Sequence, residues 1–391
     1  MNMMRHLNVP NADVELVFNL LKQNCWHAND MLIHASDNGN YRLIPLNDNF
    51  PAEPSREFLE YEIINCEGKP DTRVDPNWLN HLSKLIKKQI FNKYIQLWPS
   101  SHEFIGDMMI VRIDEEILKF SSQIAQAKLE AHPKLRLVMS DGGVLGVLRI
   151  RELKIIGVRE GNKLILQNIP TNLRNTKVIV KESGREILCD PSKAYFSTKL
   201  QTERQETLLF AKKLHDLLGR KINVCDPFCG VGPALASLLS EKNLVDNLLA
   251  SDLNPDAIEI LFENLTKWDK KSYTSLSKNL QWLYHDRLVG VADAIDVSSN
   301  ENYIGKWDLL IINLPHRTLE LLPKLLPLLD TNSPSLIRGR VVVEESNIDS
   351  INKKLNLILP NILHGSKKPE LQIKRDYSSK LRLCSFEAWL E

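Results

Sequence analysis

Residues 223–233 read NVCDPFCGVGP, and this stretch decides the fold of the chain. Val224 lies in a short apolar run that predicts a strand, and Asp226 stands where that strand should end. Gly230 and Gly232 permit a sharp turn, and the residues from Pro233 onward predict a helix. A strand, an acid, two glycines and a helix start form one half of a nucleotide-binding site, because the helix start offers unpaired N–H groups.

The sequence around this loop predicts the fold class. From residue 191 onward expected strands and helices alternate, and the apolar runs LLII at 309–312 and VVV at 341–343 suit strands buried on both faces. Residues 191–391 therefore predict an α/β domain with a mostly parallel, doubly wound sheet. Residues 1–75 and 76–190 each mix expected helices and strands. We expect two smaller α+β domains there, preceding the α/β domain.

Polar residues stand at the ends of the next expected strands. Asp252 follows one strand, Asp293 ends another, and Asn313 follows the apolar run at 309–312. The carboxyl ends of parallel strands share one edge of the sheet, where such folds bind ligands. An acid at 252 can accept both ribose hydroxyls of a nucleoside, and one at 293 can accept from an adenine amino group. The third glycine of the NAD fingerprint is replaced by Leu235, which argues against NAD.

Composition excludes several classes of protein. The chain has 391 residues, a hydrophobic fraction of 43% and a net charge of +1, as in a globular protein rather than a strongly basic one. The six cysteines are scattered without zinc-ligand spacing, so we expect reduced thiols and no metal. The start lacks an apolar signal core, and the chain lacks an apolar run of about 18 residues. We therefore expect a cytoplasmic protein without a membrane partner.

A helix is expected over residues 77–98, and it carries a basic face. Its lysines are Lys84, Lys87, Lys88 and Lys93. Such a face is either solvated, as in many amphipathic helices, or in contact with phosphates. The sequence leaves both interpretations open.

Four runs of the chain together resemble a known family. They are AYFSTKLQTER at 194–204, CDPFCGVGP at 225–233, SDLNPDAIEIL at 251–261 and INLPH at 312–316. They are similar to the archaeal and eukaryotic tRNA guanine-37 N1-methyltransferases and their relatives in wybutosine synthesis. With SSHEFIGDMMIVRI and GVLRIRELKIIG upstream, the similarity covers residues 95–391. The resemblance implies a Rossmann-like class I methyltransferase domain, S-adenosyl-L-methionine as cofactor and tRNA as partner.

The resemblance also implies roles for individual residues. Glu203 would be the general base that removes the guanine N1 proton, and Arg149 would stabilise the charge that then develops on O6. Asn313 and Pro315 would hold the flipped purine. A proton on N1 requires a base, and a guanidinium suits a developing anion. The implied cofactor contacts are Tyr195, Lys199, Arg204, Asp226, Phe228, Gly230, Gly232, Asp252, Asp293 and Asn313. Lys199 stands where the family usually has arginine.

Other interpretations stay open. Glu203 and Arg204 begin an expected helix, where an acid often serves the helix start. Arg149 is expected on a strand beside Arg151 and Glu152, where a local ion pair would explain it. A wybutosine-pathway relative would transfer an aminocarboxypropyl group, or methylate C7 of a tricyclic base. A non-catalytic RNA-binding protein and a small-molecule methyltransferase are further alternatives. We expect a monomer, because domains on the same chain can grip tRNA.

Overall fold

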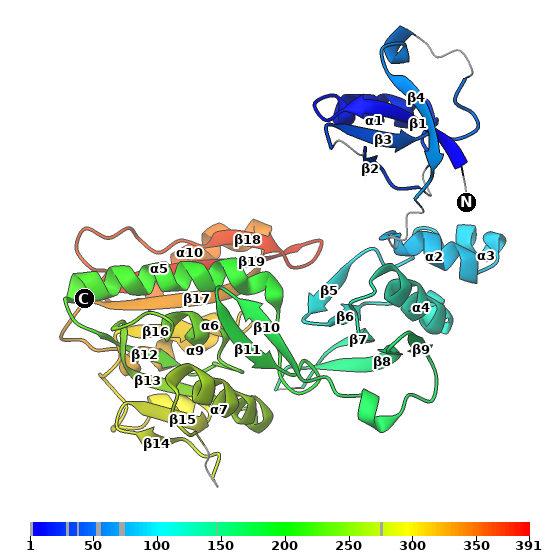
Figure 1. Cartoon of the computed structure of the whole chain (residues 1–391). Coiled ribbons are helices and arrows are strands. Elements are labelled where there is room, and N and C mark those ends of the chain that lie inside the picture. Colours follow the sequence, from blue (N-terminus) through cyan, green and yellow to red (C-terminus); the bar gives the residue numbers. More distant parts are fainter. Residues whose placement is uncertain are drawn as a thin grey trace. The chain divides into compact units, whose positions relative to one another are not determined.

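A computed structural model describes residues 3–28, 31–36, 39–51, 56–69, 75–146, 148–273 and 277–391 (Figure 1). The chain divides into two compact units, Met1–Pro76 and Asn77–Glu391. The expected boundary at 75/76 lies beside this division, whereas the expected boundary at 190/191 falls inside the second unit. The division of that unit into two domains stays a prediction.

The first unit is an antiparallel sheet with a helix on one face. Leu7 and Ile44 of the sheet pack with Val17 and Leu21 of the helix, and Phe50 closes the same core. The strand order is β2-β3-β1-β4. The elements are β1 (Met3–Pro10), α1 (Val14–Gln23), β2 (His34–Ala35), β3 (Tyr41–Pro45), η1 (Arg56–Phe58) and β4 (Glu62–Glu67).

Strands β2 and β3 pair as the expected hairpin, with His34 opposite Leu43. Residues 37 and 38 of its expected turn lie outside the described residues. The sequence did not predict β1 as a strand.

The second unit begins with two short helices, α2 (Trp78–Leu85) and α3 (Lys88–Lys93). The single helix expected over 77–98 is wrong. Ile86 leaves the helical conformation, with φ −124° and ψ 140°, and its side chain is buried with Trp78 and Trp98. Burial of this β-branched side chain outweighs the helix propensity of its neighbours.

The middle part of this unit is a mixed sheet of order β5-β6-β7-β8-β9. Helix α4 covers one face through Ala125 and Leu129, which pack on Val138. The other face belongs, through Met108 and Leu137, to the buried cluster that also lies on one face of the large eight-stranded sheet. The elements are β5 (His102–Ile105), β6 (Met108–Val111), η2 (Glu115–Phe120), α4 (Ser121–Ala131), β7 (Leu137–Leu145), β8 (Ile150–Glu160), β9 (Lys163–Ile165) and η3 (Thr171–Leu173).

The sequence predicts that Arg149 lies on a strand, and this prediction is wrong. It occupies the turn between β7 and β8, with a positive φ of 55°. A positive φ is unusual for a residue with a Cβ and places the backbone in the left-handed region. The turn carries the Arg149 side chain away from the ladder in which Arg151 pairs with Val144.

The last part is built on a sheet of order β14-β15-β13-β12-β16-β17-β19-β18 (Figure 1). Neighbours from β15 to β17 pair in parallel, while β19 runs antiparallel to β17 and β18. Its strands are β12 (Ile222–Asp226), β13 (Val245–Asp252), β14 (Gln281–Tyr284), β15 (Arg287–Val291), β16 (Leu309–Ile312), β17 (Ser335–Glu344), β18 (Gln372–Asp376) and β19 (Leu381–Leu390).

Helices cover both faces of this sheet, as the alternating sequence predicts. Val224 of β12 belongs to the core under α5, α6 and α7, and the next residue, Cys225, belongs to the core on the other face, under α8, α9 and α10. This alternation follows from the strand period of two. The helical elements are η4 (Thr198–Leu200), α5 (Gln201–Leu218), α6 (Pro233–Leu238), α7 (Pro255–Asp269), α8 (Ala294–Ser298), α9 (Thr318–Leu325), η5 (Leu326–Leu328), η6 (Glu345–Asn347) and α10 (Ile348–Ile358).

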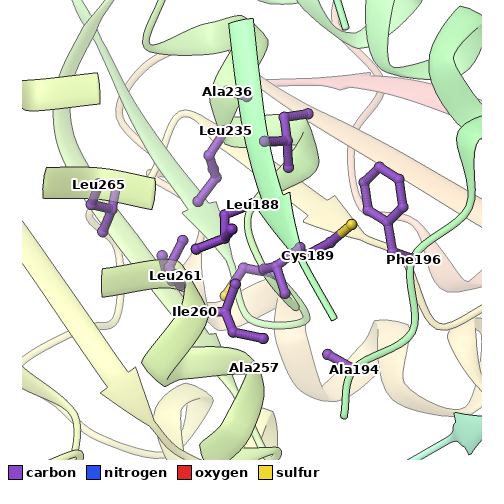
Figure 2. Packing of buried hydrophobic residues seen from close by; sticks show 14 of the residues in the cluster. Leu188, Cys189, Ala194, Phe196, Leu235, Ala236, Ala257, Ile260, Leu261 and Leu265 are labelled. Carbon is purple, nitrogen blue, oxygen red and sulfur yellow. The ribbon is translucent and has the colours of Figure 1, made fainter. Parts of the chain in front are cut away.

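A hairpin of β10 (Val178–Glu182) and β11 (Arg185–Cys189) lies over α6 and α7. Figure 2 shows Leu188 of β11 beside Leu235 of α6 and Leu261 of α7, in one buried cluster. Ala194 and Phe196 continue that cluster along the chain leading to α5. The hairpin thereby positions the segment that carries Tyr195 and Glu203.

Candidate functional site

A pocket opens at the carboxyl edge of the large sheet, where β12, β13, β15 and β16 end. Its wall contains seven of the residues predicted from the sequence: Arg149, Tyr195, Phe228, Gly230, Asp252, Asp293 and Asn313. These residues come from four strand ends, the segment before α5 and the β7–β8 turn. The ends of parallel strands meet at one edge, so the position of the pocket follows from the topology.

The loop between β12 and α6 forms the floor of this pocket. Gly230 and Gly232 have positive φ values of 54° and 82°. A Cβ on Gly230 would meet only the Tyr195 carbonyl oxygen, at 4.0 Å, so the backbone is open to a ligand there. A Cβ on Gly232 would stand 2.6 Å from Leu261 Cδ1. Gly232 therefore serves the packing of the loop on α7, whereas Gly230 leaves space in the pocket.

Asp252 is held by the backbone on two sides. Its Oδ2 accepts a hydrogen bond from Gly230 N, and its Oδ1 accepts one from Asn254 N, both at 2.9 Å. Burial raises the pKa of Asp252, and these backbone hydrogen bonds oppose the rise. Each carboxylate oxygen has a second lone pair, so the group can still accept hydroxyls from a ligand.

Asp293 also has a structural task. It is the N-cap of α8, where its Oδ1 accepts from Ile295 N at 2.8 Å. Its position in the pocket wall leaves the carboxylate accessible from the ligand side. The residue therefore combines the capping role that its sequence context suggests with the predicted binding position.

Asp226 lies behind the pocket rather than in its wall. It is 2% exposed, and its Oδ1 accepts from Phe228 N at 3.2 Å. Burial raises its pKa to about 7, and the nearby charge of Asp252 acts in the same direction. The side chain fixes the loop from below at the cost of burying an ionisable group.

Glu203, the predicted base, connects to the pocket through an arginine. Its side chain is buried at the first turn of α5, and its Oε2 lies 2.9 Å from Arg340 Nε in an ion pair. Arg340 Nη1 donates to Asn313 Oδ1 at 2.8 Å. Arg340 on β17 thus links the predicted base to a residue of the pocket wall.

Arg340 remains charged at neutral pH although it is buried. Burial lowers its pKa to about 10, and Glu203 opposes that change. No motif of the sequence predicts a role for Arg340. An arginine between the apolar stretches of β17 is the available signal, because a buried guanidinium needs an anionic partner.

Arg149 faces the last domain from the β7–β8 turn. It lines the pocket, and its charge lowers the pKa of His316, although burial of the imidazole is the larger cause. His316 Nε2 lies 2.9 Å from the Tyr377 hydroxyl. The Arg149 guanidinium is therefore close enough to the segment after β16 to act on His316.

Arg204 has a structural partner. Its Nη2 lies 2.6 Å from Glu182 Oε2 in a buried ion pair, and it also donates to the Ser197 carbonyl oxygen at 3.1 Å. The Ser197 hydroxyl donates to Glu103, which pairs with Arg151 at 2.8 Å. This network joins α5, β10 and the middle sheet.

Six predicted site residues lie outside the wall of the pocket. They are Lys199, Glu203, Arg204, Asp226, Gly232 and Pro315. Lys199 is exposed on η4. The Pro315 carbonyl oxygen accepts from Val342 N at 3.0 Å, which ties the Asn-Leu-Pro segment to β17. The predicted contacts of Lys199 and Arg204 with a cofactor remain predictions.

The strand order, the antiparallel β19 and the pocket at the carboxyl edge define the fold of the class I methyltransferases, as predicted. A family model described as the TYW2 N-terminal domain matches residues 82–160. Among curated proteins, the chain is similar to the Pyrococcus abyssi tRNA (guanine(37)-N(1))-methyltransferase Trm5b, with 31% identity over 229 residues. The match spans 58% of this chain and 58% of that relative.

Solved structures agree over the whole chain. A crystal structure of Trm5b from Pyrococcus abyssi has a TM-score of 0.62 at 23% identity and covers 100% of both chains. A structure of aTrm5 in complex with tRNALeu has a TM-score of 0.65 at 22% identity and covers 99% of both. These similarities confirm the resemblance inferred from the sequence. None of the described helices is long and apolar enough to cross a membrane.

Proposed function

We propose that the chain is an S-adenosyl-L-methionine-dependent methyltransferase that modifies N1 of guanine 37 in tRNA, 3′ of the anticodon. One observation carries the proposal. A pocket at the carboxyl edge and a buried carboxylate, Glu203, are joined through Arg340, which contacts both Glu203 and Asn313 of the pocket wall. The similarity to a curated enzyme of that name supports the choice of substrate.

The residues of the pocket fit the proposed cofactor. Asp252 presents a backbone-oriented carboxylate for ribose hydroxyls, and the open backbone at Gly230 accommodates close approach of the ligand. Phe228 and Asp293 line the same wall. When bound, the cofactor supplies a methyl group on a positively charged sulfur. Orientation is then the main task of the protein, and good orientation contributes about 7–11 kcal/mol to such reactions.

The other side of the site fits a purine that must lose a proton. Glu203 is the proposed acceptor of the N1 proton, and Arg149 the partner of the charge on O6. Arg340 donates a hydrogen bond to Asn313 Oδ1. The NH2 group of Asn313 therefore remains able to donate to the purine. The guanine must leave its stack in the RNA to enter the pocket, as for other enzymes that act on nucleobases.

Exposed charge suits a tRNA partner. The basic side chains on and between α2 and α3 are exposed: Lys84 on α2, Lys87 at the N-cap of α3, and Lys88 and Lys93 on α3. Lysines of this kind contact phosphates without reading sequence. The tRNA, the monomeric state and the cytoplasmic location are parts of the same proposal. Sedimentation of the purified protein would test the monomer.

The proposal is tested with an unmodified tRNA transcript and a methyl-labelled cofactor. We expect labelled N1-methylguanine in the nuclease digest, and none from a matched transcript with adenine at position 37. Cofactor binding is measured on the same protein by calorimetry. Tight binding of the cofactor without any labelled nucleoside would refute the proposed substrate, and absence of cofactor binding would refute the proposed class.

A second function has specific support. The match of residues 82–160 to the TYW2 N-terminal domain favours transfer of an aminocarboxypropyl group by the same fold. The sequence Asn313-Leu314-Pro315 speaks for N1 methylation, since the aminocarboxypropyl transferases generally lack it. The mass of the modified nucleoside distinguishes methyl from aminocarboxypropyl in the same digest. Unmodified RNA that is nevertheless tightly bound would point to the non-catalytic alternative.

A further inference from the structure

Three side chains of the first unit bring metal-ligating atoms together. His6 on β1, His34 on β2 and Cys66 on β4 each offer one donor atom, and these atoms lie within 4.8 Å of one another. The sheet explains the cluster. Met4 stands opposite Cys66 in the ladder, and His6 follows two residues later on the same face. This face is opposite the one on which Leu7 packs with α1.

The hydrogen-bonding capacity of the buried His6 side chain is only partly used among the described residues. His6 is fully buried, and its Nδ1 lies 3.1 Å from the Met4 carbonyl oxygen and 3.2 Å from Cys66 Sγ. Its Nε2 is buried without a hydrogen-bond partner among the described residues. Asn8 Oδ1, two residues along the same face of β1, is in the same condition. Buried polar atoms of native proteins are normally satisfied, so two such atoms on one face of β1 point to a ligand.

Further sulfur atoms stand at the same end of the sheet. A Cβ on Gly68, two residues after Cys66, would stand 2.4 Å from Met4 Sδ and 3.3 Å from Met31 Sδ. The absence of a side chain at 68 therefore leaves room for two thioethers beside the cluster. Imidazole, thiol and thioether groups are ligands for thiophilic metal ions rather than for Mg²⁺ or Ca²⁺.

We propose that His6, His34 and Cys66 bind one thiophilic metal ion, Zn²⁺. Tetrahedral Zn²⁺ with bonds of 2.0–2.3 Å keeps its ligand atoms roughly 3.5 Å apart, so the side chains need to move inward by about 1 Å. The Leu32 carbonyl oxygen, 3.3 Å from His34 Nδ1, orients that imidazole and leaves its Nε2 for the metal. A bound ion would connect β1, β2 and β4.

The cluster shares no residue with the site of the proposed methyl transfer, since all its residues lie in the first unit. The sequence alone predicts no metal site. The three residues are far apart in the chain and show no zinc-ligand spacing, and only the pairing of strands brings them together.

The test uses the full chain, stripped of metal with a chelator under reducing conditions. Zn²⁺ affinity is measured by competition with a chromophoric chelator, and Co²⁺ is added separately to report tetrahedral coordination and a thiolate ligand by absorption. We expect one strong site per chain. Cys66→Ser and His34→Asn should each lower the affinity for Zn²⁺ at least about tenfold. Cys66→Ser should remove the thiolate absorption of the Co²⁺ form, and His34→Asn should remove its tetrahedral absorption.

Cys25→Ser is the matched control, because Cys25 is an exposed cysteine of the same unit outside the cluster. It should bind Zn²⁺ like the wild type. Zn²⁺ should also raise the melting temperature of the wild type and of Cys25→Ser, but not of Cys66→Ser. His34 is only half-buried, so we expect the His34→Asn variant to fold. It therefore tests the metal site even if Cys66→Ser does not fold. Absence of a strong site in the wild type, or unchanged affinity in both cluster variants, would overturn the proposal.

Discussion

The two halves of the candidate site depend on different parts of the polypeptide. The loop side, from Asp226 to Asp252, is formed by backbone conformation, with Gly230 N donating to Asp252 Oδ2. The Glu203 side is formed by charged side chains, with Arg340 lying between Glu203 and Asn313. The first half comes from consecutive strands of one sheet, and the second joins α5, β16 and β17. Substitutions should therefore act differently on the two sides.

The difference has an energetic reason. A backbone cradle tolerates changes of side chain but not changes of φ, because its N–H groups do the binding. A buried ion pair tolerates small backbone shifts but not the loss of one partner, which leaves an uncompensated charge. Changes on the loop side should therefore affect stability and cofactor affinity, and changes on the Glu203 side should affect stability and turnover.

The largest expected effect is on turnover in Glu203→Gln. The amide is close in shape to the carboxylate, but it does not accept the proton from guanine N1. We expect the rate of tRNA methylation to fall about a thousandfold, within the range for loss of a general base. Affinity for the cofactor should stay within about twofold, since Glu203 lies outside the pocket wall. Single-turnover methylation and calorimetry measure the two quantities.

Glu206→Gln is the control for this variant. Glu206 lies on the same helix and pairs with Arg338 and Lys374 instead of Arg340. It should retain turnover within a few fold of the wild type. Equal losses in Glu203→Gln and Glu206→Gln would show that the charge network, and not a base, explains the effect.

The two halves of the site also differ in how much of their structure can be predicted from the sequence. Phe228, Gly230, Asp252 and Asp293 share one pocket wall, because each lies just after or at the carboxyl end of a strand that the sequence predicts. Their contacts with a cofactor stay predictions. The partner of Glu203 was not predicted. Arg340 lies 137 positions further along the chain (340 − 203), and only the pairing of β17 with β16 brings it beside Asn313.

Arg149 and Arg204 illustrate two other limits. The sequence placed Arg149 on a strand, because LGVLRIREL reads as one continuous β run, but the chain turns there with a positive φ. For Arg204 the resemblance implies a role in the site, which stays a prediction. Its side chain pairs with Glu182 on a hairpin whose position no local pattern predicts.

A smaller effect is expected from Asp226→Asn, and it depends on pH. Burial raises the pKa of Asp226 from 3.8 to about 7, so the folded state holds a proton that the unfolded state releases. This contribution to stability is complete below pH 3.8 and is lost as the pH rises through about 7. Relative to the wild type, the asparagine variant should gain free energy of unfolding between pH 4 and pH 8, by at most about 4 kcal/mol.

Urea unfolding at pH 5 and pH 8 measures that gain. The amide oxygen of the substituted side chain would keep the acceptor for Phe228 N, so the hydrogen bond beneath the loop should persist. Asp349→Asn, at an exposed carboxylate in the first turn of α10, is the control and should show no change of stability between the two pH values beyond that of the wild type. A constant difference between Asp226→Asn and the wild type at both pH values would contradict the raised pKa.

The smallest expected effect separates packing from backbone strain on the loop side. Gly232→Ala brings a Cβ within 2.6 Å of Leu261 Cδ1 at a φ of 82° and should lower the free energy of unfolding by about 2 kcal/mol. Gly219→Ala, at the C-cap of α5, has a φ of 64° and no neighbour within 4 Å, so it bears the strain alone, about 1 kcal/mol. Thermal unfolding of the two variants measures the difference. Equal destabilisation by the two substitutions would mean that the contact between the loop and α7 adds nothing to the cost of the positive φ. The loop side would then be limited by its backbone conformation alone.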